Sequence, residues 1–258
     1  MPEFETVRIE IENSIGRLTM NRPESLNAFN EKLTFEIQSA LKNFSNDKNV
    51  RCVAITGSGR AFSAGQDLKE ELTINFSEML ERRYNPIIKL ITGMQKPVVA
   101  LINGIAAGAG MSLALACDFK IMSAGAKLAQ AFVKIGLVPD SGSSYFLARL
   151  VGYSKAFELA ALGGEISADE ALKLGIVNRV FHDDKFCNES AEILKQFASG
   201  PTKAYSLIKK MLNYSAGASL EQSLDYEAYM QEIAGRSEDA REGRKAFVEK
   251  RSPTFKGK

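Results

Sequence analysis

The segment from Asn103 to Asp118 could place backbone N–H groups against a negatively charged group. Its side chains are almost all small until Met111, so a ligand or another segment can approach the backbone closely. An apolar run, Pro97–Ile102, precedes it, and a helix-like run, Met111–Ala116, follows it. A strand, a glycine-rich turn and a helix in this order direct the unpaired N–H groups of the helix start toward one point. The sequence therefore predicts a site for developing negative charge.

Two further segments combine small residues with a polar side chain. Gly59–Leu68 follows a predicted buried strand, and its small residues at 63–65 indicate a tight loop with an accessible backbone. Ile135–Ser144 contains Asp140, after an apolar run and before a Ser- and Gly-rich helix start. Each segment also has a purely structural interpretation. The first is equally well an ordinary strand-to-loop turn, and an N-cap is the commoner role for an aspartate like Asp140.

The composition limits the chemistry that such a site could use. The 258 residues include one histidine, His182, no tryptophan, and three widely spaced cysteines, Cys52, Cys117 and Cys187. His182 lies in a predicted polar turn, so it is badly placed for a Ser-His-Asp triad. Zinc sites built on several histidines are excluded, and the cysteines lack the close spacing of a thiolate site. We expect no metal ion, and catalysis must then rely on carboxylates and backbone N–H groups.

Charge and hydropathy predict the setting of the chain. The formal net charge is +2, with lysine and arginine spread along the sequence, so we expect no nucleic-acid partner. The N-terminal residues lack the apolar core of a signal peptide, and no apolar run is long enough to span a bilayer. Free cysteines in apolar surroundings are typical of a reducing compartment. We expect a cytoplasmic protein that does not bind membranes.

Hydrophobic periodicity predicts a strand-rich α/β region followed by helices. We divide the chain into a core over residues 1–190 and a helical region over residues 191–258. Residues 67–82 have a mixed polar pattern that indicates loop and short helix. The clearest patterns predict strands over Thr6–Ile11, Ile15–Met20, Val50–Thr56 and Phe119–Met122, and helices over Ala28–Phe44 and Met79–Met94 and from the capping box Ser167–Glu170.

Taken together and in this order, the three segments resemble the crotonase family, also called the enoyl-CoA hydratase/isomerase superfamily. The flanks agree at Met20–Ala28, Lys96–Ala100 and Phe247–Arg251, so the resemblance covers essentially the whole chain. It implies an α/β fold, a crotonase-like spiral of ββα units with a helical C-terminal region for trimerisation. It also implies an acyl-CoA thioester substrate and assembly as a homotrimer or homohexamer. Coenzyme A is then part of the substrate, and we expect no separate cofactor.

The resemblance assigns roles to individual residues. Family members hold the thioester oxygen with two backbone N–H groups as it becomes an enolate, and the matching donors here are Gln66 and Ala109. The backbone of Ala64 is expected near the adenine of coenzyme A, with Gly65 and Gly110 also against the substrate. One such preorganised donor lowers the barrier by about 3–4 kcal/mol.

Other side chains are candidates for substrate contacts, each with a structural alternative. Arg22 and Lys250 are candidates for contacts with the coenzyme A phosphates, because these groups carry the charge of the ligand, but both are equally well solvated surface residues. The C-terminal helices of the family reach across to a neighbouring subunit, so the resemblance implies that Lys250 acts there. Tyr84 is a candidate for the acyl pocket or a residue of an amphipathic helix. Asp67 lies beside the loop donor, where an aspartate more often stabilises its own turn.

The residues that differ from hydratases point to another reaction. Hydratases of the family use two glutamates, because water loses a proton on one side while the α-carbon receives one. At the matching positions this chain has Ser112, which we interpret as a small packing residue, and Phe132, which would dry the pocket. Asp140 remains as the single base. A single base suffices for an isomerisation, in which it removes a proton and returns it to another carbon.

A narrower resemblance supports this choice. Ala61–Leu68, Glu81–Pro86 and Gly136–Asp140 are similar to a subgroup of isomerases that open the ring of 1,2-epoxyphenylacetyl-CoA in phenylacetate catabolism, although Ser141–Ser144 departs from the glycine-rich run of that subgroup. We predict isomerisation of 1,2-epoxyphenylacetyl-CoA or of a 3-enoyl-CoA. There are two alternatives. One is an enoyl-CoA hydratase, which is a lyase, using water held by Asp140, and the other is a noncatalytic acyl-CoA-binding protein.

Overall fold

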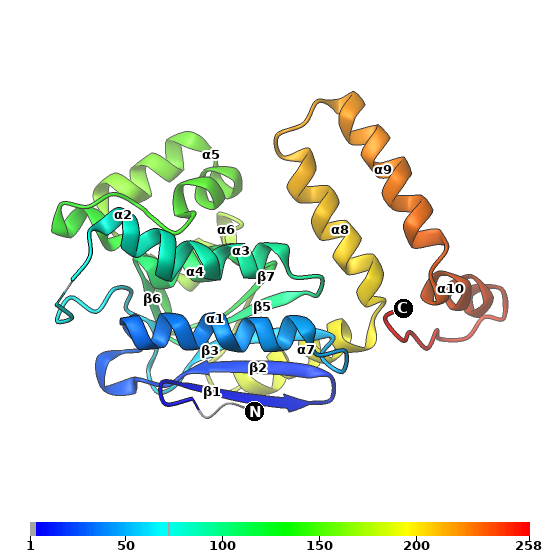
Figure 1. Cartoon of the computed structure of the whole chain (residues 1–258), viewed down its shortest axis with the longest axis horizontal. Helices are drawn as coiled ribbons and strands as arrows, with labels where there is room; N and C mark the ends of the chain where they lie inside the picture. Colours follow the sequence, from blue (N-terminus) through cyan, green and yellow to red (C-terminus); the bar gives the residue numbers. More distant parts are fainter. Residues whose placement is uncertain (1–3, 72) are drawn as a thin grey trace.

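Two β-sheets and the helices that cover them form the body of the molecule in a computed structural model that describes residues 4–71 and 73–258 (Figure 1). β1 and β2 pair antiparallel, and the other neighbours in the larger sheet are parallel. The larger sheet has the strand order β1 (Val7–Glu12), β2 (Ile15–Met20), β3 (Cys52–Gly57), β5 (Val98–Ile102), β7 (Phe119–Ser123) and β10 (Arg179–Phe181). The strands predicted over Thr6–Ile11 and Ile15–Met20 are confirmed and pair as a hairpin.

The smaller sheet has shorter strands, which the sequence patterns did not indicate. In it, β4 pairs parallel with β6 and β6 with β8, whereas β8 and β9 are antiparallel. The strands are β4 (Ala61–Ser63), β6 (Ile105–Ala107), β8 (Lys127–Ala129) and β9 (Glu165–Ser167). Each long strand β3, β5 and β7 is followed by a short strand of this second sheet and then by helix. This repeated order confirms the predicted spiral of ββα units.

The centre of the larger sheet is buried on both faces because its central strands, β3 and β5, are almost entirely apolar. Val53 and Ile55 face the main core, which includes Leu33 and Ile37 of helix α1 (Glu31–Asn46). The alternate residues of β3, Cys52 and Ala54, face a second cluster with helix α7 (Phe186–Ser199). Helix α1 begins later than the predicted Ala28–Phe44 because the Asn30 side chain caps it, accepting from the Leu33 N–H at 2.9 Å.

The remaining helices of the body surround the short strands. The helix predicted over Met79–Met94 is instead three consecutive pieces: an α-helical turn, a π-helical turn and a second α-helix. The first piece starts at residue 76, before the predicted start. These helices and the shorter turns are η1 (Pro23–Ser25), α2 (Phe76–Met79), the π-helical η2 (Leu80–Tyr84), α3 (Asn85–Gly93), α4 (Ala109–Ala116), η3 (Ala131–Ile135), α5 (Ser143–Leu162) and α6 (Ala168–Lys173). The predicted start of α6 is confirmed, since Ser167 accepts from the Glu170 N–H.

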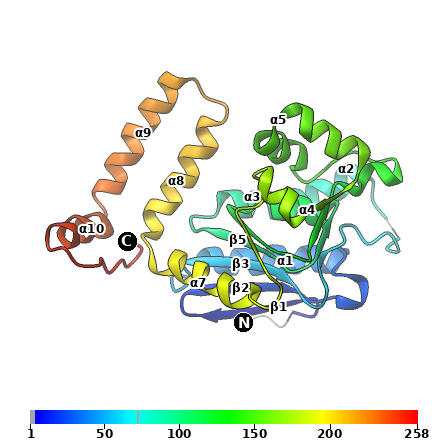
Figure 2. The same cartoon turned by 180° about the vertical axis from the view of Figure 1, so that it is seen from behind.

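The last three helices stand to one side of the sheets (Figures 1 and 2). They are α8 (Thr202–Ser215), α9 (Leu220–Gly235) and α10 (Glu238–Val248). The boundary predicted at residue 190 falls inside α7, which packs on the larger sheet, so the separate helical region begins with α8. Of the helices in the described residues, none combines the length and apolar character needed to cross a bilayer.

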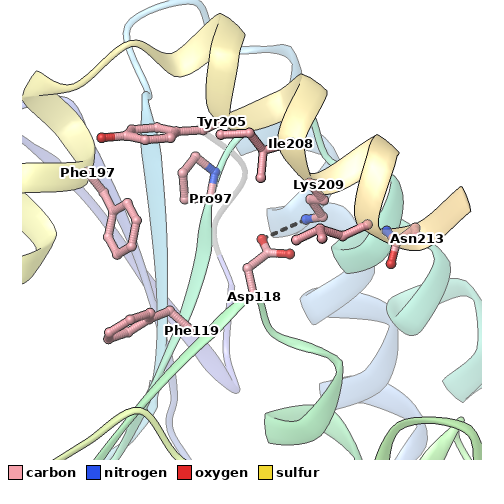
Figure 3. Close-up of a pocket in the computed structure, with 9 residues that line it drawn as sticks. Pro97, Asp118, Phe119, Phe197, Tyr205, Ile208, Lys209 and Asn213 are labelled. Atoms are coloured by element: carbon pink, nitrogen blue, oxygen red, sulfur yellow. Dashed lines mark hydrogen bonds and ion pairs between the residues drawn. The ribbon is translucent and has the colours of Figure 1, made fainter. Parts of the chain in front are cut away.

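Helix α8 is fastened to the body by a lysine. The Lys209 ammonium donates to the Asp118 carboxylate at 2.8 Å (Figure 3). It also donates to the Ile91 carbonyl at 2.6 Å. A mostly apolar cavity of about 280 Å³ lies beside this ion pair, between α8 and the ends of strands β5 and β7. It shares no lining residue with the candidate site described below.

Candidate active site

A cavity of about 430 Å³ lies between the loop after β4, the start of α4 and the segment from η3 to α5. It brings together Gln66, Ala109 and Asp140, of which the first and the last are more than 70 residues apart in the sequence. Its lining consists of Ala64, Gly65, Gln66, Asp67, Leu68, Glu70, Phe76, Met79, Gly108, Ala109, Ala131, Phe132, Lys134, Ile135, Leu137 and Asp140. The predicted loops therefore form one site.

Two glycines allow the two donor loops to touch. A Cβ atom on Gly65, whose φ is +91°, would lie 2.8 Å from the Ala107 carbonyl oxygen. A Cβ atom on Gly110 would lie 2.4 Å from the carbonyl oxygen of Ser63 in β4. Any larger residue at either position would push the loops apart. Gly110 thus sets the spacing of α4 and β4. It is absent from the cavity lining, so the cavity does not support its predicted contact with the substrate.

The backbone N–H groups of Gln66 and Ala109 are free to bind a ligand. Phe29 pairs with this loop: its N–H donates to the Gly65 carbonyl, and its carbonyl accepts from the Asp67 N–H. The Gln66 N–H, between these two bonds, therefore points away from Phe29. Ala109 is the first residue of α4, where an N–H group has no acceptor within the helix. Neither amide donates to any acceptor in the part of the chain that the structure describes.

Asp140 presents a half-buried carboxylate to the same cavity. Helix α5 starts at Ser143 after Gly142 and has no side-chain cap, so the N-cap interpretation of Asp140 is wrong. One of its oxygens accepts from the Ser141 hydroxyl at 2.8 Å. Burial raises the pKa of Asp140 above its ordinary value of 3.8, and the Ser141 hydrogen bond opposes part of that rise. Its carboxylate is thereby a better proton acceptor than an exposed aspartate.

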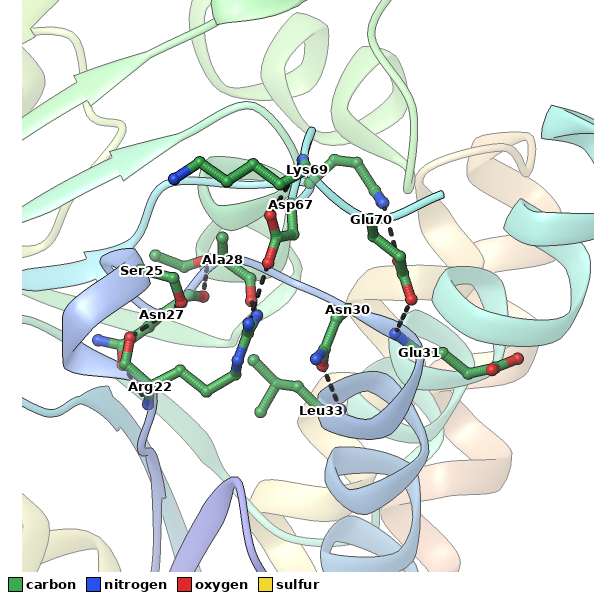
Figure 4. A network of polar contacts seen from close by, with 12 residues as sticks. Arg22, Ser25, Asn27, Ala28, Asn30, Glu31, Leu33, Asp67, Lys69 and Glu70 are labelled. Carbon is green, nitrogen blue, oxygen red and sulfur yellow. Dashed lines mark hydrogen bonds and ion pairs between the residues drawn. The ribbon is translucent and has the colours of Figure 1, made fainter. Parts of the chain in front are cut away.

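The other two carboxylates of the cavity are neutralised by arginines, and Figure 4 shows the pair of Arg22 and Asp67. The Arg22 guanidinium contacts Asp67 at 3.0 Å and also donates to the Ala28 carbonyl at 2.6 Å. Asp67 accepts from the Lys69 N–H as well, at 3.2 Å, which confirms its role within its own loop. Glu70 contacts buried Arg83 at 3.0 Å. Arg22 therefore braces the loop and is absent from the cavity lining, and its contact with a coenzyme A phosphate stays a prediction.

The other predicted residues divide between the cavity and its surroundings. Ala64, Gly65 and Phe132 line the cavity. The Ser112 hydroxyl donates to the Gly108 carbonyl of its own helix at 3.2 Å and is fully buried, as expected for a packing residue. Tyr84 lies behind Gln66 and is absent from the lining, so the acyl-pocket assignment is not supported. Lys250 is an exposed residue just after α10, on the separate helical region.

Much of the cavity wall comes from residues that sequence reasoning missed. Leu68 and Phe76, at the mouth, are 67% and 53% exposed, which is unusual for large apolar side chains beside a polar loop. Met79 and Leu137 add apolar surface, and Glu70 lies beside Gln66. The available signal was the presence of apolar residues in the otherwise polar 67–82 segment.

Comparison with known proteins agrees with this geometry. Residues 10–258 match the family described as Enoyl-CoA hydratase/isomerase. The chain is 38% identical to 1,2-epoxyphenylacetyl-CoA isomerase of Escherichia coli K12, over 99% of this chain and 100% of that protein. It is 37% identical to a probable enoyl-CoA hydratase of Rhodobacter capsulatus, over 99% of each. A crystal structure of enoyl-CoA hydratase from Bacillus anthracis superposes with a TM-score of 0.93 at 31% identity, covering 98% of this chain and 100% of that one. The names divide between isomerase and hydratase, so the reaction must be inferred from the site.

Proposed function

Because the chain belongs to the enoyl-CoA hydratase/isomerase family, we propose that it is an acyl-CoA isomerase with Asp140 as its single acid–base group. The observation that carries this proposal is the state of the three carboxylates that line the cavity. Asp67 and Glu70 are each paired with an arginine, whereas among the described residues the Asp140 carboxylate accepts from the Ser141 hydroxyl alone. Asp140 is therefore the carboxylate available to accept and return a proton.

The two free N–H groups supply the second requirement of such a reaction. A thioester oxygen placed between the Gln66 and Ala109 amides accepts a hydrogen bond from each. When Asp140 removes the proton next to the carbonyl, the electron pair moves into the thioester and the oxygen becomes an enolate. The two donors stabilise this charge most strongly in a mostly apolar cavity, where water competes little. Asp140 then returns the proton to another carbon, which completes the double-bond shift.

Hydration of a 2-enoyl-CoA would need a second base, and the site offers no suitable group at the expected positions. Ser112 is buried and bonded to its own helix, and Phe132 places an aromatic ring on the cavity wall. A single carboxylate that shuttles one proton fits isomerisation better than the addition of water.

We propose two substrate classes for this base, 1,2-epoxyphenylacetyl-CoA and 3-enoyl-CoA. Both have an acidic C–H bond next to a thioester carbonyl, so the same enolate chemistry serves them. The E. coli relative, 38% identical, is named for the epoxide. No metal or resident cofactor takes part in this scheme, since coenzyme A enters with the substrate.

A homotrimer or homohexamer is the assembly that we propose for the active protein. The helices α8 to α10 expose large apolar side chains, which another subunit would cover. These include Leu212, Leu220, Phe247 and Val248. Lys250, which follows α10, would then lie close to coenzyme A bound to a neighbouring subunit.

An ultraviolet assay with three substrates tests the proposed reaction. The purified protein is given a 3-enoyl-CoA, a 2-enoyl-CoA and 1,2-epoxyphenylacetyl-CoA, and turnover and binding are measured for each. We expect turnover of the 3-enoyl-CoA, the epoxide or both, and slow or no hydration of the 2-enoyl-CoA. Fast hydration would instead identify a hydratase. Binding without turnover of any of the three would identify an acyl-CoA-binding protein.

A further inference from the structure

The side chain of Gln66 is held at both ends of its amide group. The Tyr84 hydroxyl donates to the Gln66 Oε1 atom, and the Gln66 Nε2 atom donates to a Glu70 carboxylate oxygen at 3.3 Å. Gln66 is also the residue whose backbone N–H faces the cavity. A contact on its side chain therefore acts on the orientation of a predicted oxyanion donor. We call Tyr84, Gln66 and Glu70 the amide clamp.

A π-helical turn places Tyr84 in the clamp. In η2 the consecutive residues Arg83 and Tyr84 are both only 3% exposed, so both turn toward the donor loop. The side-chain amide of Gln38 on α1 donates to the Arg82 and Arg83 carbonyls, at 3.0 and 3.1 Å, and thereby supports the irregular turn. Short π-helical segments cost stability and occur frequently at functional sites.

The surroundings fix the Tyr84 hydroxyl as a hydrogen-bond donor. The ring of Tyr84 packs edge-to-face against Phe29, with centroids 5.8 Å apart, and the backbone of Phe29 pairs with the Gln66 loop. Burial and the nearby carboxylates of Asp140 and Glu70 raise the pKa of Tyr84, so its hydroxyl keeps its proton at any working pH.

Glu70 is anchored as firmly at the other end of the clamp. Its carboxylate accepts from the Glu31 N–H at 2.8 Å (Figure 4). It also contacts buried Arg83 at 3.0 Å. Arg83 also contacts the Glu31 carboxylate, at 3.2 Å. The clamp is therefore attached to Glu31 of α1 and to Arg83 of η2, two elements of the body.

We propose that Tyr84 and Glu70 are positioning residues that hold the Gln66 backbone N–H in the orientation that binds the thioester oxygen. The backbone of Phe29 fixes the residues on either side of Gln66, and the clamp adds a restraint on Gln66 itself, which follows a glycine with a permissive backbone. Preorganised donors stabilise an oxyanion because they do not have to reorient during the reaction. The proposal rests on the proposed function, in which this N–H is one of two donors.

A double-mutant cycle with Tyr84→Phe and Gln66→Leu tests the clamp. Both variants keep the backbone N–H of residue 66 and lose the hydrogen bond between the side chains of residues 84 and 66. We expect each to lower kcat about tenfold with KM changed by less than about twofold, and the double variant to be no worse than about tenfold. Tyr205→Phe, which removes a partly buried hydroxyl outside the cavity, is the matched control and should keep full turnover.

Binding of cinnamoyl-CoA gives a readout that a purely structural role would not move. This conjugated thioester absorbs at longer wavelength when its carbonyl oxygen is polarised by hydrogen bonds. We expect a red shift on binding to the wild-type protein and a smaller shift with Tyr84→Phe and with Gln66→Leu, at equal saturation. Circular dichroism and thermal unfolding show whether each variant is folded, and Gln66→Leu serves alone if Tyr84→Phe does not fold.

The outcomes separate the clamp from the proposed function. Unchanged kcat in folded Tyr84→Phe, an unchanged red shift, or single effects that multiply to about a hundredfold would each overturn the clamp. A wild-type protein that shifts cinnamoyl-CoA but turns over none of the proposed substrates would refute the isomerase, and a loss of that shift in Tyr84→Phe would still support the clamp. Absence of any shift in the wild-type protein overturns the clamp as well.

Discussion

The Ala109 N–H group can be removed without removing any side chain that contacts substrate. Proline lacks this N–H, and it is well tolerated at the first position of a helix, where Ala109 stands. No intrahelical hydrogen bond is broken, because this amide has no acceptor among the described residues. The preceding residue is Gly108, which has no Cβ atom to collide with the proline ring. Ala109→Pro should therefore fold like the wild-type protein.

The expected loss of activity follows from the position of this donor. Ala109 is 3% exposed and lies in a mostly apolar cavity, so water cannot readily replace its hydrogen bond to the enolate. Removal of one oxyanion-hole donor costs about 2.7–4 kcal/mol, which lowers kcat about 10²–10³-fold. Steady-state kinetics with the 3-enoyl-CoA or the epoxide measure this change, and KM should change much less.

Glu238→Pro is the matched control for Ala109→Pro. It introduces proline at the first position of α10, at an exposed residue that is absent from the cavity lining. Both variants should unfold within a few degrees of the wild-type protein, and only Ala109→Pro should lose turnover. A folded Ala109→Pro protein with kcat within about threefold of wild type would refute the assignment of this N–H as a donor.

Four further predictions concern the base and the spacing of the donor loops. Burial raises the pKa of Asp140, so kcat should fall with decreasing pH through a pKa above 3.8, as a pH–rate profile will show. The same raised pKa means that the ionised carboxylate opposes folding at neutral pH. Asp140→Asn should then resist urea better at pH 7, with the difference disappearing below pH 3.8. Gly110→Ala forces a Cβ atom to 2.4 Å from the Ser63 carbonyl, so urea unfolding should show a loss of about 1–3 kcal/mol, together with lower kcat. Ser112→Ala removes a hydroxyl whose one hydrogen bond among the described residues is to the Gly108 carbonyl, so kinetics should show kcat within about twofold of wild type.

The long strands and the donor loops were predictable because their signals are local. β3 and β5 are continuous apolar runs, and such runs are typical of parallel strands buried on both faces. The small residues around Gly65 and Gly108 indicated that two backbone segments approach closely there, because larger side chains would keep them apart. The second sheet gave no such signal, since each of its strands has three residues, too few to show an alternating pattern.

The side-chain contacts of the site depend on distant parts of the chain, and the sequence could not reveal them. Arg22 was a candidate for phosphate binding, but a fold that brings it to Asp67 uses its charge within the loop. Tyr84 was expected in the acyl pocket, and a π-helical turn directs it to Gln66 instead. A single irregular turn rotates every following side chain, and hydrophobic periodicity does not report it.

The central claim is that Asp140 alone moves the proton, and Asp140→Asn tests it most directly. Asparagine keeps the size of the side chain and an acceptor for the Ser141 hydroxyl but cannot accept a proton as a base. Single-turnover isomerisation of the 3-enoyl-CoA or the epoxide should slow by about 10²–10⁴-fold, with binding of the acyl-CoA unchanged. A folded Asp140→Asn protein that isomerises the same substrate within about tenfold of the wild-type rate would contradict the account.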